Sequence, residues 1–248
     1  FTGAGTTTYT IGGRLVLGAS TTFTAASSTV LMNATTTGKS ITAPDLVTFH
    51  DLTLDGSGGV WNLGAAILVE GDMTVTDGTV TGTRDITLPT GSITGNGVLS
   101  LGGGTTTIES TNTLGGTSAW TFYNLQLGDG VQVGTTTPAT SATTTVSGRL
   151  TISAAHFLDA GATEWDLAGT GTVFVEDGTF LEDTSTVRYS GNGSNVLSTQ
   201  YYNLDLNAGA GGPTYTATGI GIIVDNDLTI GGDDLTMATN TSGAVLVA

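Results

Sequence analysis

The hexapeptide Phe49-His50-Asp51-Leu52-Thr53-Leu54 is the first of three related copies in this chain of 248 residues. It returns as Phe122-Tyr123-Asn124-Leu125-Gln126-Leu127 and as Tyr201-Tyr202-Asn203-Leu204-Asp205-Leu206. Every copy ends in two leucines that are separated by one residue. Residues two apart in an extended chain point to the same side, so each copy predicts a β-strand with one buried face.

A shorter pattern, a polar residue followed by an aliphatic, any residue and a second aliphatic, runs along the whole chain. The first aliphatics stand at positions 15, 30, 52, 73, 86, 108, 125, 150, 167, 187, 204, 228 and 245. Their mean spacing is about 19 residues, a length typical of solenoid repeats. We therefore predict an all-β fold, a parallel β-helix (β-solenoid) with about 19 residues per rung and roughly 12–13 rungs.

The paired aliphatics are the predicted interior of this coil, where they should stack as ladders. The predicted ladder residues are Leu15, Leu17, Leu52, Leu54, Met73, Val75, Leu125, Leu127, Leu150, Ile152, Leu204, Leu206, Leu228 and Ile230.

A second anchor follows each hexapeptide, as Gly71–Val75, Gly148–Ile152 and Asn226–Ile230. About four rungs then make one sequence repeat, with anchors near 49, 122 and 201, inside a single solenoid that spans residues 1–248. The longest marker step runs from 125 to 150, so we predict a protruding loop at 134–145.

Composition limits the partners. Five Lys and Arg residues face 21 Asp and Glu residues, which gives a net charge of −16. Nucleic acid and anionic membranes are poor partners for such a surface. No apolar run approaches the roughly 20 residues of a membrane span, so we predict no membrane insertion. Cysteine is absent, which excludes disulfides and thiol chemistry.

Thr186-Val187-Arg188-Tyr189-Ser190-Gly191-Asn192-Gly193, followed by the third hexapeptide and Asp227-Leu228-Thr229-Ile230, resembles the repeats of large secreted bacterial surface proteins. These are the filamentous-haemagglutinin-type and other adhesin-like β-solenoids. The resemblance covers nearly the whole chain. It implies export, an extracellular or cell-surface location, and a structural or adhesive role, and it brings no catalytic residues.

We predict a non-catalytic module without catalytic, cofactor or metal residues. The alternative is a carbohydrate-active β-helix enzyme, a polysaccharide lyase or hydrolase, which would need clustered carboxylates beside Arg or Lys. Lys39 is the only lysine, and the four arginines are scattered over different repeats. They are Arg14, Arg84, Arg149 and Arg188. His50 and His156 lack metal-ligand spacing.

The polar residue before each leucine has two interpretations. Asp51, Asp72 and Asp85 precede consecutive rungs, and stacked carboxylates repel one another unless they are neutralised. Bound Ca²⁺ is one answer. We favour the other, in which these side chains cap turns by accepting hydrogen bonds from backbone N–H groups. Asn124 and Asn203 fit that role well.

The aromatic residues suggest a binding surface. If alternation holds through the hexapeptide, then His50, Tyr123 and Tyr202 share the inner face of the leucines. Their neighbours would then form an outer stripe that binds surface glycans or a neighbouring rod. The stripe would consist of Phe49, Phe122 and Tyr201. The alternative for these residues is cross-strand packing on a solvated sheet.

The terminal segments Phe1–Leu17 and Ala244–Val247 carry little charge to protect a strand edge. We therefore expect these edges to pair with flanking solenoid rungs or with copies of the same chain. The first case makes the chain a segment of a longer solenoid, and the second makes a head-to-tail filament.

Overall fold

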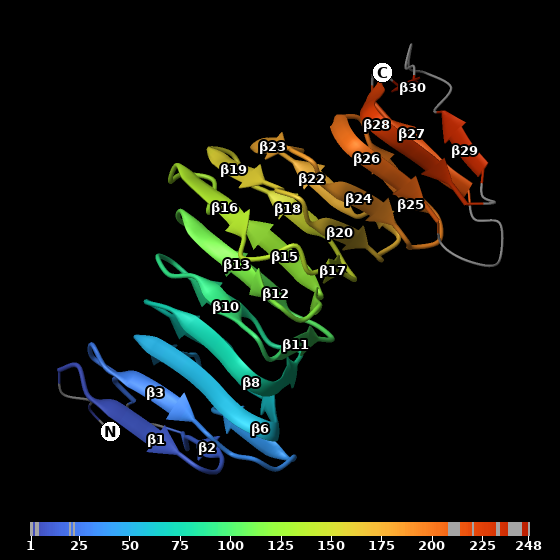
Figure 1. Cartoon of the computed structure of the whole chain (residues 1–248). Helices are drawn as coiled ribbons and strands as arrows, with labels where there is room; N and C mark the ends of the chain where they lie inside the picture. The colour runs from blue at the N-terminus through green and yellow to red at the C-terminus, as the bar shows by residue number, and fades with distance from the viewer. Residues whose placement is uncertain are drawn as a thin grey trace.

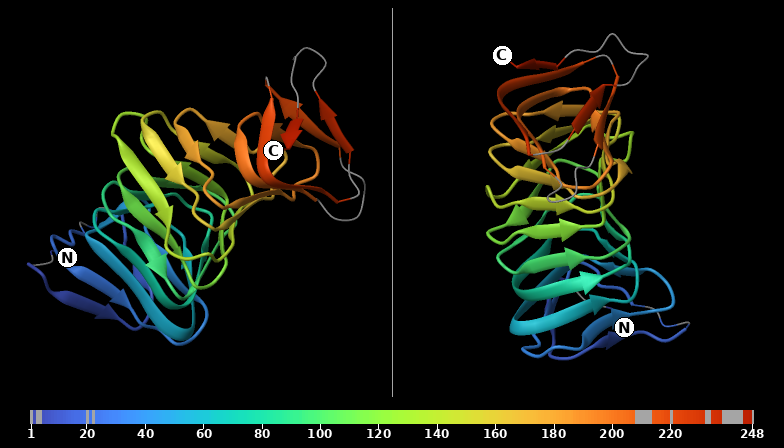
Figure 2. Two further views of the ribbon diagram at one scale, coloured as in Figure 1. Left: turned by 45° about the horizontal axis from the view of Figure 1, so that its top comes forward. Right: turned by 90° about the vertical axis from the view of Figure 1, so that its right-hand side faces the viewer.

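The chain winds into a rod of stacked parallel strands (Figure 1). The structure, a computed structural model, describes residues 2, 5–19, 21, 23–207, 214–219, 221–231, 234–237 and 245–247. Every strand pairing among these residues is parallel, for example β1 with β3 and β6 with β8. Successive turns follow one another along the rod, and β1 and β30 lie at opposite ends (Figures 1 and 2). The predicted β-solenoid is confirmed.

The strands form three faces, and a complete turn contributes a strand to each of them. Face one contains β1 (Thr8–Ile11), β3 (Thr29–Met32), the first parts of β6 (Asp51–Leu63) and β8 (Met73–Gly82), β10 (Ile93–Gly95), β13 (Asn112–Gly116), β16 (Gly134–Pro138), β19 (His156–Asp159), β23 (Thr179–Leu181), the first parts of β26 (Gln200–Leu206) and β28 (Ile222–Ile230), and β30 (Val245–Val247).

Face two contains β2 (Leu15–Val16), β4 (Lys39–Thr42), the second parts of β6 and β8, β11 (Val98–Leu101), β14 (Trp120–Phe122), β17 (Thr144–Val146), β20 (Glu164–Leu167), β24 (Thr186–Tyr189), and the second parts of β26 and β28. Face three contains β5 (Val47–Phe49), β7 (Ile67–Val69), β9 (Ile86–Leu88), β12 (Thr105–Ile108), β15 (Asn124–Leu127), β18 (Leu150–Ile152) and β22 (Phe174–Glu176), followed by β21 (Gly171–Thr172), β25 (Ser194–Leu197), β27 (Thr214–Thr218) and β29 (Asp234–Met237).

The period differs from the predicted 19 residues. The described residues make about 10 turns, and the rungs lie about 21 residues apart. The sequence markers ran short because they changed face. Met73 stacks on Leu52 in face one, whereas the next marker, Ile86, pairs with Ile67 in face three. Steps of this kind count part of a turn as a whole one.

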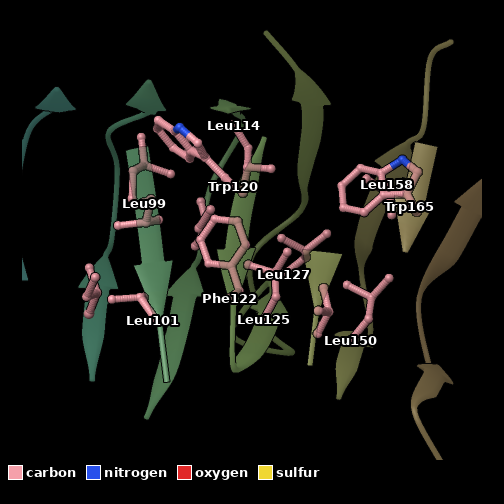
Figure 3. Packing of buried hydrophobic residues seen from close by; sticks show 14 of the residues in the cluster. Leu99, Leu101, Leu114, Trp120, Phe122, Leu125, Leu127, Leu150, Leu158 and Trp165 are labelled. Carbon is pink, nitrogen blue, oxygen red and sulfur yellow. The ribbon is translucent and has the colours of Figure 1, made fainter. Parts of the chain in front are cut away.

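The interior is a column of aliphatic and aromatic side chains (Figure 3). On face two, Thr144 lies in register between Trp120 and Trp165. A small side chain between two indoles leaves room for both rings, as close packing requires. The indole nitrogen of Trp120 donates to the carbonyl of Gly97 at 2.9 Å, so this buried polar group has a partner.

Most of the predicted ladder is buried. The ten fully buried members are Leu52, Leu54, Met73, Val75, Leu125, Leu127, Leu150, Ile152, Leu204 and Leu206. Leu15, Leu17 and Leu228 are partly buried, and Ile230 is 42% exposed, contrary to the prediction. The pairs stack only within a face, as Leu125 does on Leu150. Ile230 pairs with Leu206 on one side, and no described strand of face two covers its other side.

The sequence repeat is not a whole number of turns. From Leu52 the face-one ladder runs through Met73 and Ile93 to Leu114, which is three full turns. The chain then crosses face two before it reaches the equivalent Leu125 on face three. The third equivalent, Leu204, lies on face two. Each repeat therefore presents its hexapeptide on a different face.

The predicted loop at 134–145 is wrong. Residues Gly134–Pro138 form β16 and Thr144–Val146 form β17, both paired with neighbouring turns. The extra length of this turn includes residues 128–133, where Val131 is 81% exposed. The carboxylate of Asp129 accepts hydrogen bonds from the backbone N–H groups of Val131 and Gln132, each at 2.8 Å, and holds that loop.

Candidate functional site

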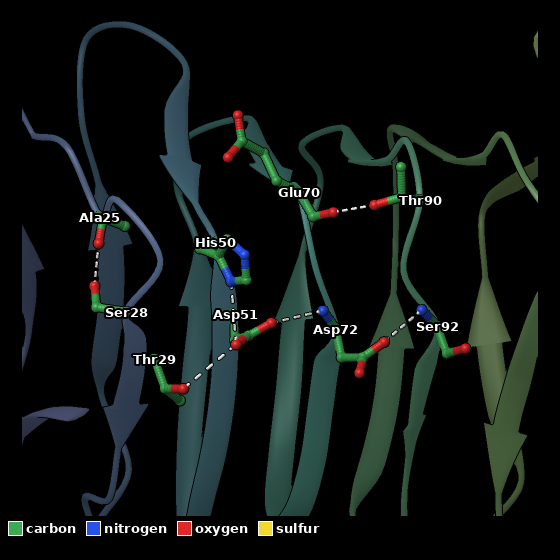
Figure 4. A network of polar contacts seen from close by, with 9 residues as sticks. All are labelled: Ala25, Ser28, Thr29, His50, Asp51, Glu70, Asp72, Thr90 and Ser92. Carbon is green, nitrogen blue, oxygen red and sulfur yellow. Dashed lines mark hydrogen bonds and ion pairs between the residues drawn. The ribbon is translucent and has the colours of Figure 1, made fainter. Parts of the chain in front are cut away.

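The polar residues at the corners hold consecutive turns together. Oδ1 of Asp51 accepts a hydrogen bond from the backbone N–H of Asp72 at 3.0 Å (Figure 4). Oδ1 of Asp72 accepts from the N–H of Ser92 at 2.8 Å, one turn further along. Oδ1 of Asp85 accepts from the N–H of Thr105 at 2.8 Å. The predicted capping role of these aspartates is confirmed, and it satisfies N–H groups at corners where the strand ladder is interrupted.

The same bond recurs in the other two repeats. Oδ1 of Asn124 accepts from the N–H of Arg149 at 3.0 Å, and Oδ1 of Asn203 accepts from the N–H of Asp227 at 3.3 Å. An amide oxygen can thus replace the carboxylate. Among the residues that the structure describes, no three His, Cys, Asp or Glu side chains gather in a way that could hold a metal ion.

The predicted outer stripe is wrong. Phe49, Phe122 and Tyr201 are fully buried. Phe49 packs against Phe23 with ring centroids 5.5 Å apart, and Tyr201 packs against Phe180 at 6.3 Å. Phe122 packs against Trp120 at 6.4 Å. These rings therefore belong to the core.

Alternation fails at the corner, which explains the error. Phe49 ends β5 on face three and Asp51 begins β6 on face one, so the chain bends at His50 between them. The bend lets both Phe49 and Leu52 point inward although three positions separate them. The residue at the bend points outward instead, and Tyr123 in the second repeat is 42% exposed. The hexapeptide changes face at its second residue. Side-chain periodicity within a strand does not reveal such a bend, so it could not predict which aromatic residue points outward.

The corner of the second repeat borders a shallow polar groove. It has a volume of about 450 Å³ and lies on the outside of face three, across β12, β15 and β18, which run side by side (Figure 1). Its polar lining includes Tyr123, Asn124, Gln126, Arg149, Thr151 and Thr172.

Arg149 is fixed across this groove by two contacts. Its backbone N–H donates to Asn124 Oδ1, and its side-chain Nε donates to the carbonyl of Thr172 at 3.1 Å. Gly148 makes the corner tight, because a Cβ there would lie 2.4 Å from Asn124 Oδ1 and 2.8 Å from the carbonyl oxygen of Tyr123. The groove thus places one exposed guanidinium beside one exposed phenol.

The charge of the groove is opposite to that of the chain. Arg149 is one of five Lys and Arg residues against 21 Asp and Glu residues. No carboxylate lines the groove. The other arginines lie elsewhere. Arg84 borders a second groove with Asp45 and Asp85, and Arg188 lies 3.7 Å from Asp205.

A third cavity, of about 340 Å³, is apolar and lies at the first turn. Its lining includes Ile11, Leu15, Leu17 and Phe23, which are only partly buried against the core. In the next turn Met32 and Ile41 occupy the register positions of Ile11 and Leu15 and are fully buried. The first turn therefore exposes apolar side chains, whereas their equivalents in the next turn are buried.

Comparison of the chain with protein-family models, with curated proteins and with solved structures gives no match. Within the described ranges, no helix has the length and apolar character needed to cross a membrane.

Proposed function

We propose that this solenoid is a non-catalytic structural or adhesive module of an extracellular or cell-surface assembly. The observation that carries the proposal is the use of the recurring acidic residues. The series from Asp51 to Asp72 to Ser92 joins successive turns through backbone N–H groups, so these carboxylates serve the rod itself. The resemblance to filamentous-haemagglutinin-type and other adhesin-like repeats supports the same role.

Assembly would use the first turn. Its partly buried Leu15 and Phe23 line the apolar cavity, and burial of apolar surface favours association. Flanking rungs of a longer solenoid, or a second copy that stacks head to tail, would cover this surface with another turn and continue the parallel ladder. Sedimentation velocity across a concentration series tests the second arrangement. Concentration-dependent association that Leu15→Asp abolishes is expected for a head-to-tail filament, and a monomer at every concentration would contradict the filament.

One observation favours the alternative of a carbohydrate-active enzyme. Arg188 stands in register between Asp166 and Asp205 on the outside of face two. Its guanidinium lies 3.7 Å from Asp205 and 4.0 Å from Glu164. Burial raises the pKa of Asp205, Arg188 lowers it and Asp166 raises it. Glycan-cleaving sites use a pair of carboxylates, and an arginine beside them can stabilise charge that develops in the transition state.

An activity screen separates the two candidates. The full chain is incubated with acidic and neutral polysaccharides, and new reducing ends and unsaturated products are measured over time. No product above the level of a heat-denatured control is expected. Reproducible turnover that disappears in both Arg188→Gln and Asp205→Asn would overturn the non-catalytic proposal.

A further inference from the structure

The three repeats can be compared at one corner, because each of them makes the same hydrogen bond there between a backbone N–H group and a side-chain oxygen. The residue that donates its N–H to the corner cap is Asp72 in the first repeat, Arg149 in the second and Asp227 in the third. The cap itself is Asp51, Asn124 and Asn203 in turn. The second repeat alone replaces an aspartate at this corner with a cation.

The exchange is not required by the corner. The hydrogen bond to Asn124 uses the backbone N–H of Arg149, which any residue except proline would supply. The side chain extends instead to the carbonyl of Thr172 through Nε. Among the described residues no acidic group forms an ion pair with Arg149. Its two terminal nitrogens remain available to a ligand, whereas the guanidinium of Arg188 is matched by acids.

The groove around Arg149 offers hydrogen-bond donors and one aromatic surface. A guanidinium binds a carboxylate through two parallel N–H···O bonds, which gives direction as well as attraction. The exposed ring of Tyr123 supplies a flat apolar surface with a polar tip. Thr151 and Thr172 add hydroxyl groups that donate and accept. These groups together match a sugar ring that carries a carboxylate.

The net charge of the chain narrows the ligand further. A charge of −16 repels densely charged polymers such as nucleic acids and polyphosphates. A single guanidinium without a protein counter-ion can still attract an isolated negative charge at close range. The ligand should therefore carry widely spaced carboxylates.

We propose that the groove around Arg149 and Tyr123 binds a glycan with well-spaced carboxylated sugars. Arg149 takes the carboxylate in a two-bond contact, and the ring of Tyr123 packs against the apolar face of the sugar. The inference names a ligand for the non-catalytic module proposed above, and to that extent it rests on that proposal.

The test uses a hyaluronan tetrasaccharide, in which glucuronate alternates with N-acetylglucosamine. Its carboxyl-reduced form and the neutral N-acetylglucosamine tetramer serve as matched ligands. Binding to the full chain is measured by isothermal titration calorimetry and by saturation-transfer NMR. The intact tetrasaccharide should bind, and both uncharged ligands should bind about tenfold more weakly or worse, the loss expected for one charge-assisted contact.

The variants isolate the groove. Arg149→Gln should weaken binding about tenfold or more. Arg84→Gln removes the same charge at another exposed corner of face three and should bind like the wild type. Tyr123→Ala should weaken binding, whereas Tyr123→Phe should retain it. Circular dichroism and thermal unfolding should match the wild type in Arg149→Gln, because the corner bond is made by the backbone.

The outcomes separate the two proposals. Absence of binding to the tetrasaccharide would overturn this inference and leave the non-catalytic module standing. Equal affinity for the intact and carboxyl-reduced ligands, or undiminished binding by a folded Arg149→Gln variant, would overturn it too. Tetrasaccharide that is bound through Arg149 and then cleaved would support the site and overturn the non-catalytic role.

Discussion

His156 is buried in the core beside face one with only half of its polar groups paired. Nε2 lies 2.9 Å from the hydroxyl of Thr136, while Nδ1 has no hydrogen-bond partner among the described residues. Gly128 and Gly134 leave space for the ring, since a Cβ at Gly134 would lie 2.9 Å from its Cε1. Burial lowers the pKa of His156 below its usual 6.5, and the charge of Asp129 opposes this in part.

This histidine should make the fold sensitive to acid. The unfolded chain takes up a proton as the pH falls through about 6.5, whereas the folded chain keeps the ring neutral. Stability contributed by the neutral ring is therefore lost as the pH falls from that value towards the lower folded pKa. We expect the melting temperature to fall between about pH 7 and pH 5, and to fall less in His156→Gln.

Wild type and His156→Gln are compared at each pH of the same series. An identical pH dependence in wild type and His156→Gln would contradict the prediction.

Gly148 is needed because the turns approach closely at its corner. Gly148→Ala places a methyl group 2.4 Å from Asn124 Oδ1 and 2.8 Å from a backbone oxygen, and backbone cannot move aside without breaking the Arg149 bond. We expect a loss of about 1–3 kcal/mol in the free energy of unfolding, the usual cost of overpacking. Urea denaturation measures it.

Gly13→Ala is the control for this substitution. No described atom lies within 4 Å of a Cβ built at Gly13. Its free energy of unfolding should stay within about 0.5 kcal/mol of the wild type. Equal effects of the two substitutions would show that the close approach at Gly148 is not what limits the corner.

At the scale of elements, face three changes partners within one turn. β22 pairs with β18 on one side, whereas the neighbouring β21 pairs with β25 and opens a second sheet. Buried tyrosines fill this break. The hydroxyl of Tyr201 lies 2.9 Å from that of Tyr189 and donates to the carbonyl of Leu197 at 2.8 Å, while the N–H of Leu197 donates to Tyr189 at 3.1 Å. Burial raises the pKa of Tyr189 to about 12.

Removing one hydroxyl should weaken this junction. Tyr201→Phe leaves the carbonyl of Leu197 and the hydroxyl of Tyr189 each short of a partner in a buried setting. The expected loss is about 1–3 kcal/mol in the free energy of unfolding. The neighbouring and less buried Tyr202→Phe should cost less than about 0.5 kcal/mol. Chemical denaturation of both variants decides between them, and equal losses would refute a special role for the junction.

The sequence predicted the strands better than it predicted the corners. Paired aliphatics such as Leu52 and Leu54 reveal an inward face, because alternation within one strand is strictly periodic. The capping role of Asp51 also followed from residue type, since a carboxylate before a strand can accept from a backbone N–H group. The fold class and the capping role of the corner residues could therefore be predicted from the sequence.

The number of faces in each turn could not be predicted from the sequence. Nothing in the pattern shows that Met73 and Ile86 belong to different ladders, so the period came out too short. The same ambiguity led to the wrong prediction that Phe49 is exposed and Tyr123 is buried. A bend changes which residues of the chain point inward. The groove at Arg149 joins residues about one turn apart, and its recognition required the true register.

The whole molecule is an acidic rod, and its charge should limit its stability. A net charge of −16 on a narrow solenoid produces self-repulsion that salt screens. We expect the melting temperature to rise when the salt concentration is raised from about 0.01 M to about 0.5 M, because the screening length shortens several-fold over that range. Equal effects of NaCl and KCl would identify screening, and an unchanged melting temperature would contradict the prediction.

The rotation of the repeats around the rod has a consequence for how such a molecule can diversify. Equivalent corners stand at Leu52, Leu125 and Leu204 on three different faces, so they look out in three directions. A substitution at one corner, such as the arginine at position 149, alters the surface on one side of the rod. The equivalent surfaces on the other two sides are unchanged. Copies of the repeat thus face different directions from the start. Each copy can change its own binding surface without changing those of the other two.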